Sequence, residues 1–267
     1  MPREVTAFSN TTVKRLRSLR DKKARKEEGL FLAEGLRIIT EARDSGLLPE
    51  IVMFSAEGAR HPLASEIIAA TEAAGGDAIE TTPDILSKTS GKDNPQMLLA
   101  AYRQPETSLT AIDRSSAPLW FAAQALRDPG NIGTILRTGD AVGAGGLILI
   151  DDSADPYSVE AVRASMGAIF TQKVAKATWS EFVNWLRSGE GQLVGTSLNT
   201  NQDYLKVEYQ RPNFLLIGNE QQGLPSAYEK ECDLLVKIPM AGRADSLNAA
   251  IAAAVMAFQV KASWRDR

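Results

Sequence analysis

The sequence predicts an α/β protein in two parts, and three observations support this. Short apolar runs alternate with amphipathic stretches of helical period along most of the chain. The stretch 103–118, RQPETSLTAIDRSSAP, loses this periodicity and gathers Pro, Ser and Thr. The run 119–126, LWFAAQAL, is almost wholly apolar, which is typical of a buried parallel strand. We therefore expect a domain at 1–105, a linker at 106–118 and a second domain at 119–267.

The first half alternates helices with strands, a pattern that favours a sheet covered by helices. In one predicted helix, Leu36, Ile39 and Ala42 share a face, and Gly46 is expected to end it. The predicted segments are, in chain order, a basic helix at about 11–26, a strand at 30–35, a helix at 35–46, a strand at 50–55, a helix at 63–76 and a strand at 96–103.

The second half has a doubly wound α/β pattern, in which ligands bind outside the carboxyl ends of the strands. Its last helix is expected to open at Ser246. The predicted strands are 119–126, 146–151, 192–198, 214–218 and 233–239, and the predicted helices before the last are 131–144, 159–170 and 178–189.

Polar residues gather in four loops that follow predicted strands. The first is RDPGNIGTILRTGD, in which Asn131 can cap the helix and Arg137 lies between one and two turns further on. The others contain Thr196 with Ser197, then Glu220 between glycines, and finally IPMAGRADSLN. Because parallel strands end on the same side of a sheet, we expect all four loops to meet at one edge.

Composition and length argue against several classes of protein. With 267 residues, 44% hydrophobic and 24% charged, the chain has the composition of a soluble globular protein. No apolar run approaches the roughly 18 residues that a membrane helix needs, and MPREVTAFSN has no apolar core of a secretory signal. The single cysteine, Cys232, excludes an intrachain disulfide, so we expect a cytoplasmic protein.

The chain also lacks the motifs of several common chemistries. It has no dinucleotide fingerprint, P-loop, nucleophile elbow or HExxH. The only histidine, His61, precedes a proline in the first half and is expected at the surface. A reaction here must proceed without a histidine base, and we expect no metal. Transfer of an already activated group, such as the methyl of a sulfonium donor, fits because positioning can supply much of the rate.

The charge is unevenly distributed along the chain. Residues 1–26 contain nine Lys and Arg against two acidic residues, although the whole chain has a net charge of −3. Such a segment favours a polyanionic partner, since neutralising phosphates releases counterions. A solvated, lysine-rich helix face is an equally open interpretation.

Three ordered motifs resemble a known family, and they are RDPGNIGTILRTGDAVGAGG, LLIGNEQQGL and IPMAGRADSLNAAIAAAV. Together with DPYSVEAVRASMGA they make about 119–262 similar to the SpoU (TrmH-type) RNA ribose 2′-O-methyltransferases of the SPOUT superfamily. The first half resembles the small ribosomal-protein-like substrate-binding domain that is often fused in front. The cues for that domain are VKRLRSLRDKKARKEEGLFLAEGLRIITEA and GKDNPQMLLAAY.

The resemblance implies a fold, a cofactor and an assembly. The second domain would be a SPOUT α/β domain with a parallel sheet, in which the chain after 214–218 threads an earlier loop to form a trefoil knot. S-adenosylmethionine would bind in the knotted loops, and two copies would form a homodimer through the C-terminal domain. The residues implied to bind the cofactor, the first three through the main chain, are Gly218, Ile238, Leu247, Thr196 and Met240.

The resemblance also implies roles in catalysis. Arg137 matches the arginine to which the family's deprotonation of the ribose 2′-hydroxyl is assigned, and Asn131, Glu220, Ser246 and Asn248 would position it and the ribose. Because a guanidinium holds its proton firmly, a second interpretation is that Arg137 orients the target phosphate and stabilises the developing alkoxide. Helix capping is the alternative role for Asn131 and Ser246, and a plain surface arginine is the alternative for Arg137.

We therefore expect methylation of a ribose 2′-hydroxyl in RNA, and in ribosomal RNA because a separate front domain suits a large target. Transfer RNA as substrate, methylation of a base nitrogen by the same fold, and a non-catalytic RNA-binding or ribosome-assembly protein remain open. The motifs depart from the family at Gly139, where alanine is common, and at Gln221. Structured RNA would dock on basic residues of the first half, namely Lys14, Arg15, Arg17, Arg20, Lys22 and Lys23.

Overall fold

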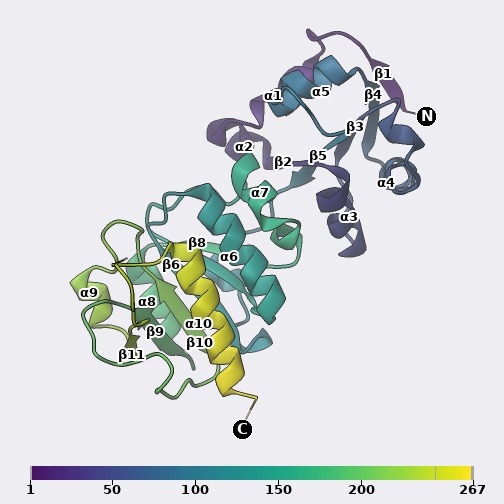
Figure 1. Ribbon diagram of the computed structural model, residues 1–267. Helices are drawn as coiled ribbons and strands as arrows, with labels where there is room; N and C mark the ends of the chain where they lie inside the picture. Colours follow the sequence, from purple (N-terminus) through teal and green to yellow (C-terminus); the bar gives the residue numbers. More distant parts are fainter. Residues whose placement is uncertain (1, 244, 266–267) are drawn as a thin grey trace. The chain divides into compact units, whose positions relative to one another are not determined.

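The computed structural model describes residues 2–243 and 245–265, and the chain folds into two compact units (Figure 1). The first unit contains Met1–Pro105 and Tyr157–Thr171, and the second contains Glu106–Pro156 and Gln172–Arg267. The chain therefore passes between the units three times. No sequence signal had pointed to the return of 157–171, and the division into domains at 105 and 119 stays a prediction.

The first unit has a mixed sheet of five strands in the order β1–β4–β3–β5–β2. Strand β5 runs antiparallel to both of its neighbours, whereas the other pairs are parallel. The strands are β1 (Arg3–Val5), β2 (Leu30–Glu34), β3 (Ile51–Ser55), β4 (Asp77–Thr81) and β5 (Leu98–Arg103). Strand β3 is buried along its whole length, as expected for a strand covered on both faces.

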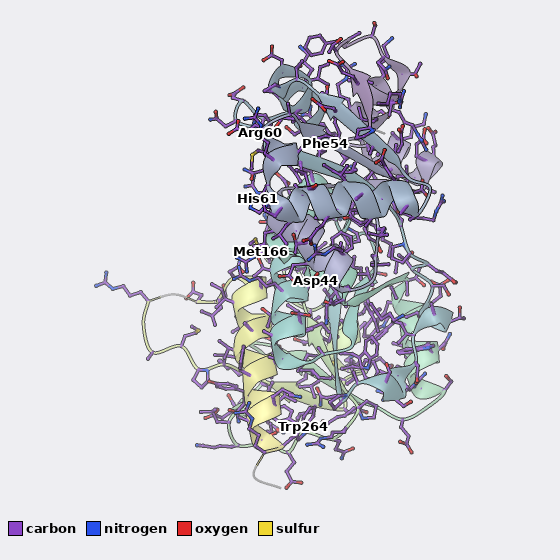
Figure 2. The ribbon with its side chains drawn as sticks, turned by 90° about the vertical axis from the view of Figure 1, so that its right-hand side faces the viewer. Asp44, Phe54, Arg60, His61, Met166 and Trp264 are labelled. Atoms are coloured by element: carbon purple, nitrogen blue, oxygen red, sulfur yellow. The ribbon has the colours of Figure 1, made fainter. Side chains whose placement is uncertain are left out.

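Helices α1 and α5 pack on one face of this sheet, where Val13, Leu16 and Ile85 join Leu32 and Met53 in one apolar cluster. The histidine expected at the surface is exposed, and it lies at the start of α4 (Figure 2). The helices of the unit are α1 (Thr11–Ser18), α2 (Lys22–Glu28), α3 (Leu36–Asp44), α4 (Pro62–Ala73), α5 (Pro83–Ser90) and α7 (Val159–Ser165), with 3₁₀ turns at Gly58–Arg60 and Ala168–Phe170.

The basic helix predicted at 11–26 is wrong, because two helices, α1 and α2, occupy this stretch. Leu19 is fully buried at the break, and the Asp21 carboxylate caps α2 by accepting from the main-chain N–H of Lys23. Arg25 is buried as well, and its Nη1 donates to the carbonyls of Leu19 and Arg20, each at 2.8 Å. Arg25 thus has a structural role, because it holds the turn between α1 and α2.

The segment Tyr157–Thr171 covers an aromatic part of the first sheet. The Phe31 ring lies 5.0 Å from Tyr157, and the Tyr102 ring lies 4.7 Å from Phe170, measured between centroids. The helix predicted at 159–170 is wrong in its second half, because α7 ends at Ser165. Met166 (φ 52°) and Gly167 (φ 102°) turn the chain away from the helix, and a Cβ at Gly167 would lie 2.7 Å from that of Glu41.

The second unit has a sheet of six strands in the order β11–β9–β10–β6–β7–β8, and every pair is parallel. The central strands β10, β6 and β7 are buried on both faces. The strands are β6 (Leu119–Gln124), β7 (Gly146–Ile150), β8 (Lys173–Ala177), β9 (Gln192–Thr196), β10 (Asn213–Ile217) and β11 (Leu234–Val236). The predicted α/β class with a parallel sheet in the second half is confirmed, and the knot stays a prediction.

Helices lie on both faces of this parallel sheet. Figure 1 shows α6 and α10 side by side, and Phe121 of β6 faces α6 near Gly139. On the other face, Phe182 and Leu186 of α8 join the sheet residue Trp120 in one apolar cluster. The helices are α6 (Pro129–Val142), α8 (Trp179–Arg187), α9 (Ser226–Glu229) and α10 (Ala249–Ser263), with 3₁₀ turns at Leu109–Ala111 and Arg114–Ser116.

Five elements were not predicted from the sequence, and most are short or lie at a sheet edge. They are β1, β4, α5, β8 and α9. The edge strand β8, KVAKA, is only five residues long and has its two lysines three positions apart, so it lacks the period-2 signal of a strand. Among the described residues, no helix combines the length and the apolar character that crossing a membrane requires.

Candidate functional site

A cavity of about 320 Å³ opens at the carboxyl-terminal edge of the parallel sheet. The loops after β9, β10 and β11 form its walls, together with residues of α9 and the first turn of α10. Its described lining residues are Thr196, Ser197, Leu198, Asn199, Ile217, Gly218, Asn219, Glu220, Gln221, Gln222, Gly223, Leu224, Glu229, Val236, Ile238, Met240, Ser246, Leu247, Ala249 and Ala252. Apolar side chains thus lie beside hydroxyl, amide and carboxylate groups.

All five residues predicted to bind the cofactor line this cavity, and they are Thr196, Gly218, Ile238, Met240 and Leu247. Glu220 and Ser246, predicted for catalysis, line it too. The strand predicted at 233–239 is shorter than expected, because β11 ends at Val236. Ile238 and Met240 therefore belong to the loop that follows the strand.

The loop after β10 bends tightly. A side chain at Gly218 would place its Cβ 2.4 Å from the carbonyl carbon of Gly223, so only glycine fits there. Asn219 holds the bend, since its Oδ1 accepts from the main-chain N–H of Gln221 at 2.9 Å. Its Nδ2 donates to the carbonyl of Ala125 at 2.8 Å, and this bond joins the loop to the one after β6.

A chain of hydrogen bonds connects three predicted residues from three elements. Asn131 Nδ2 donates to Glu220 Oε1 at 3.0 Å, and Asn248 Nδ2 donates to Asn131 Oδ1 at 2.9 Å. Asn248 Oδ1 in turn accepts from the N–H groups of Ala250 and Ile251 in the first turn of α10. The helix cap thus orients the Asn248 amide, which orients Asn131, which holds the Glu220 carboxylate. The prediction that the four loops meet at one edge is confirmed.

The predicted cap of α6 is wrong. The helix begins at Pro129, a position where proline is favoured because its missing N–H would have no helical partner. The Asp128 carboxylate caps it by accepting from the N–H of Gly130 at 2.6 Å and of Asn131 at 3.4 Å. Asn131 itself lies inside the helix and is only 7% exposed, so its side chain is free to bond with Glu220.

The helix expected to open at Ser246 begins three residues later. Helix α10 starts at Ala249, and Asn248 is its cap. Ser246 is exposed and lies in the loop before the helix, while Leu247 is half-buried against the cavity. The capping role therefore belongs to Asn248 and not to Ser246.

Arg137 lies on the exposed side of α6 and is absent from the described lining of the cavity. In the part of the chain that the structure describes, its guanidinium group has no hydrogen bond or ion pair within the protein. The structure therefore brings Asn131, Glu220 and Asn248 together and leaves Arg137 facing outward, available to a ligand.

Glu229 is a cavity residue that the sequence analysis missed. It is the last residue of α9, and its carboxylate accepts from Ser197 Oγ and from Asn199 Nδ2, the latter at 3.2 Å. These bonds tie α9 to the loop after β9. Helix α9 has four residues, too few for a helical period to show in the sequence. The polar residues of the loop after β9 were therefore the only sequence signal for this side of the cavity.

Tyr228 anchors the same short helix. Its ring stacks on Trp179 with centroids 3.8 Å apart and an angle of 4° between planes, and its hydroxyl donates to Asp151 at 2.8 Å. Burial, with a further contribution from Asp151, raises the pKa of Tyr228 to about 12. The hydroxyl therefore stays protonated near neutral pH and remains a donor.

The six basic residues predicted to dock RNA all lie in the first unit and are all exposed, namely Lys14, Arg15, Arg17, Arg20, Lys22 and Lys23. Three of them have a neighbour within the protein, and one of the three is Lys23, which lies 3.9 Å from Glu27. Arg15 Nε forms an ion pair with Glu28 at 2.8 Å. The Arg20 guanidinium lies so close to Gly91 that a Cβ there would be 2.2 Å from its Cζ.

A parallel sheet with helices on both faces defines a doubly wound α/β protein, and the cavity lies outside the carboxyl ends of the strands, where such proteins bind their ligands. The model of the SpoU rRNA Methylase family matches residues 118–258, and the model of the MRM3-like substrate binding domain matches residues 10–100. The chain belongs to the SpoU rRNA methylase family, and the resemblance drawn from the motifs is confirmed.

Characterised proteins of similar length match nearly the whole chain. The 23S rRNA (guanosine(2553)-2′-O)-methyltransferase RlmP of Bacillus subtilis is 28% identical, over 97% of this chain and 99% of its own. The 23S rRNA (uridine(2479)-2′-O)-methyltransferase of Streptomyces viridochromogenes is 32% identical, over 90% and 85%. An AdoMet-bound rRNA methyltransferase from Sinorhizobium meliloti is 39% identical over 97% of both chains, with a TM-score of 0.90.

Proposed function

We propose that this protein is an S-adenosylmethionine-dependent methyltransferase that methylates a ribose 2′-hydroxyl in ribosomal RNA. The observation that carries the proposal is the cavity at the sheet edge, whose wall holds Glu220 through Asn131 and Asn248. Family membership and relatives that methylate 23S rRNA at ribose 2′-oxygens support it. A cytoplasmic location is part of the proposal.

The residues of the cavity fit the cofactor. Ile238, Met240 and Leu247 offer apolar contact to a flat aromatic base, while main-chain groups near Gly218 and the hydroxyl of Thr196 offer hydrogen bonds to polar edges. When bound, the cofactor supplies a methyl group already activated by its sulfonium. The protein then has to bind the cofactor and the RNA, orient them and exclude water from the site. None of these tasks needs a histidine base, and the described lining contains no histidine.

Arg137 is the residue we assign to the RNA side of the reaction. Its exposed guanidinium is a planar fork of donors that suits a phosphate or a developing alkoxide. Because a guanidinium keeps its proton near neutral pH, we favour orientation and charge stabilisation over proton abstraction. Glu220 would position the ribose from the cavity wall, with Asn131 and Asn248 holding its carboxylate in place, and Ser246 would contribute from the exposed loop.

The first unit would dock the RNA through its six exposed basic residues, since phosphate contacts supply most of the sequence-independent affinity. Lys14, Arg17 and Lys22 are the strongest candidates. In the described part of the chain they take part in no ion pair, whereas Arg15 is paired with Glu28.

A homodimer through the C-terminal domain is part of the proposal. One face of α10 carries Ile251, Val255, Phe258 and Ala262 at the spacing of a helical stripe. Ile251 is 53% exposed and Phe258 is 57% exposed, although both are large and apolar. Exposed apolar stripes of this kind mark protein interfaces, and a second copy is the occupant that the family resemblance implies.

The proposed function is tested by the substitution Arg137→Ala. We expect it to abolish methylation of ribosomal RNA while leaving the dissociation constant for S-adenosylmethionine within about threefold, because Arg137 lies outside the described cavity lining. Methylation is mapped at nucleotide resolution in RNA from cells with and without the chain, and cofactor affinity is measured by calorimetry.

Two further variants serve as controls. Arg137→Lys keeps a positive charge but loses the planar fork and should retain only part of the activity. Arg265→Ala removes an exposed arginine beyond the end of α10 and should behave like the unaltered protein. Full activity of Arg137→Ala would remove Arg137 from the mechanism. Methylation found only in transfer RNA, or on a base nitrogen, would replace the proposed substrate.

A further inference from the structure

Two carboxylates line the cavity, and they come from different walls. Glu220 belongs to the loop after β10, and Glu229 ends α9. Among the described residues of the lining there is no lysine, arginine or histidine. Since glutamate side chains are acceptor-only anions when ionised, the charge of the described lining is of one sign.

Neutral donors hold Glu220. Asn131 Nδ2 donates to it at 3.0 Å, and the main-chain N–H of Arg127 donates at 3.5 Å. Arg127 could have balanced the carboxylate, but its guanidinium forms an ion pair with Asp152 instead. The carboxylate is thus fixed in position while its charge is left uncompensated by these partners.

Neutral donors hold Glu229 in the same way. A hydroxyl, Ser197 Oγ, and an amide, Asn199 Nδ2, both donate to its carboxylate. Both donors belong to the loop after β9, which is itself a wall of the cavity. The second carboxylate is therefore also built into the site without a cation among these partners.

We propose that Glu220 and Glu229 make the cavity select the methyl donor over the product that remains after transfer, an inference that rests on the proposed function. S-adenosylmethionine has a sulfonium and an ammonium against one carboxylate, so it is positive overall. S-adenosylhomocysteine has lost the sulfonium charge and is neutral overall. A recess lined by charge of one sign raises the local concentration of ligands of the opposite sign. Loss of the sulfonium charge thus weakens binding and limits inhibition by product.

The test is calorimetric titration of the full chain, without RNA, using three ligands. S-adenosylhomocysteine should bind roughly three- to tenfold more weakly than S-adenosylmethionine. An attraction of this size is expected between a ligand charge and a partly screened carboxylate a few ångströms away. Sinefungin, which has a cationic amine where the sulfonium stands, should bind like S-adenosylmethionine. Added salt should shrink the difference between the donor and the product, because ions screen charges in an open cavity.

The variant Glu229→Gln removes one charge and keeps an oxygen that can accept from Ser197. It should bring the affinity ratio of the two cofactor forms closer to one. Glu231→Gln makes the same change two residues further on, outside the described lining, and should leave the ratio unchanged. If Glu229 served only to brace the loop, both ligands would lose affinity equally and the ratio would not move.

The outcomes separate this inference from the function on which it rests. Binding of both forms with equal affinity, tighter binding of the product, or sinefungin behaving like the product would overturn charge selection and leave the methyltransferase assignment intact. Absence of any binding by S-adenosylmethionine would overturn both.

Discussion

Asn131 is held from two sides by other side chains of the site. It donates to Glu220 and accepts from Asn248, and it is only 7% exposed. The substitution Asn131→Ala leaves both neighbours without this partner. We expect a loss of about 1–2 kcal/mol in the free energy of unfolding, measured by urea denaturation, and a weaker affinity for S-adenosylmethionine.

Asn131→Asp is the sharper companion variant. It keeps the shape of the side chain and can still accept from Asn248, but it places a second carboxylate about 3 Å from that of Glu220. Like charges at that distance repel, so this variant should be less stable than Asn131→Ala at neutral pH. Equal stability of the two variants would contradict the predicted repulsion between the two carboxylates.

Cys232 gives a prediction about pH. Burial, followed by the nearby charges of Asp233 and Glu229, raises the pKa of its thiol to about 12 from an ordinary 9.0. Because the pKa is higher in the folded state, the stabilisation is complete below about pH 9 and is lost as the pH rises toward 12. The free energy of unfolding should therefore fall between about pH 9 and pH 12, and it should fall less in Cys232→Ala. An identical fall in both proteins would contradict this origin.

At the scale of elements, α6 is shaped by a glycine that faces the sheet. A Cβ at Gly139 would lie 2.6 Å from Gln172 Oε1, whose amide also donates to the carbonyl of Ala144. Alanine favours a helix interior over glycine by about 1 kcal/mol, but here it must displace Gln172. Gly139→Ala should thus be nearly neutral alone and stabilise by about 1 kcal/mol in a Gln172→Ala background, as a double-mutant cycle by urea denaturation would show. The same effect in both backgrounds would contradict the steric account.

The elements that could be predicted are those whose secondary structure is determined by the pattern of their own residues. Buried strands such as β6 and β10 are continuous apolar runs, and the polar loops that follow them meet because the strands are parallel. The breaks at Asp21 and Met166 could not be predicted, since each depends on what the chain packs against after it turns. Glu229 was missed for the same reason, because its partners come from a distant loop.

At the scale of the whole molecule, the first unit needs a segment from the middle of the chain. Tyr157 and Phe170 cover the rings of Phe31 and Tyr102 on its sheet. A fragment of residues 1–105 should therefore expose these rings, bind a hydrophobic dye and melt at a lower temperature than the same fragment with 157–171 joined to it by a flexible linker. Equal melting temperatures would show that the segment adds no stability.

The return of Tyr157–Thr171 also bears on how the protein is made. A nascent chain emerges from its amino end, and its domains generally fold in that order. Here the first unit has all five of its strands long before its aromatic cover exists, and that cover emerges only after β6 and β7 of the other sheet. The first unit therefore cannot complete its fold until residues 157–171 have been translated. Until then, the aromatic face of its sheet stays uncovered.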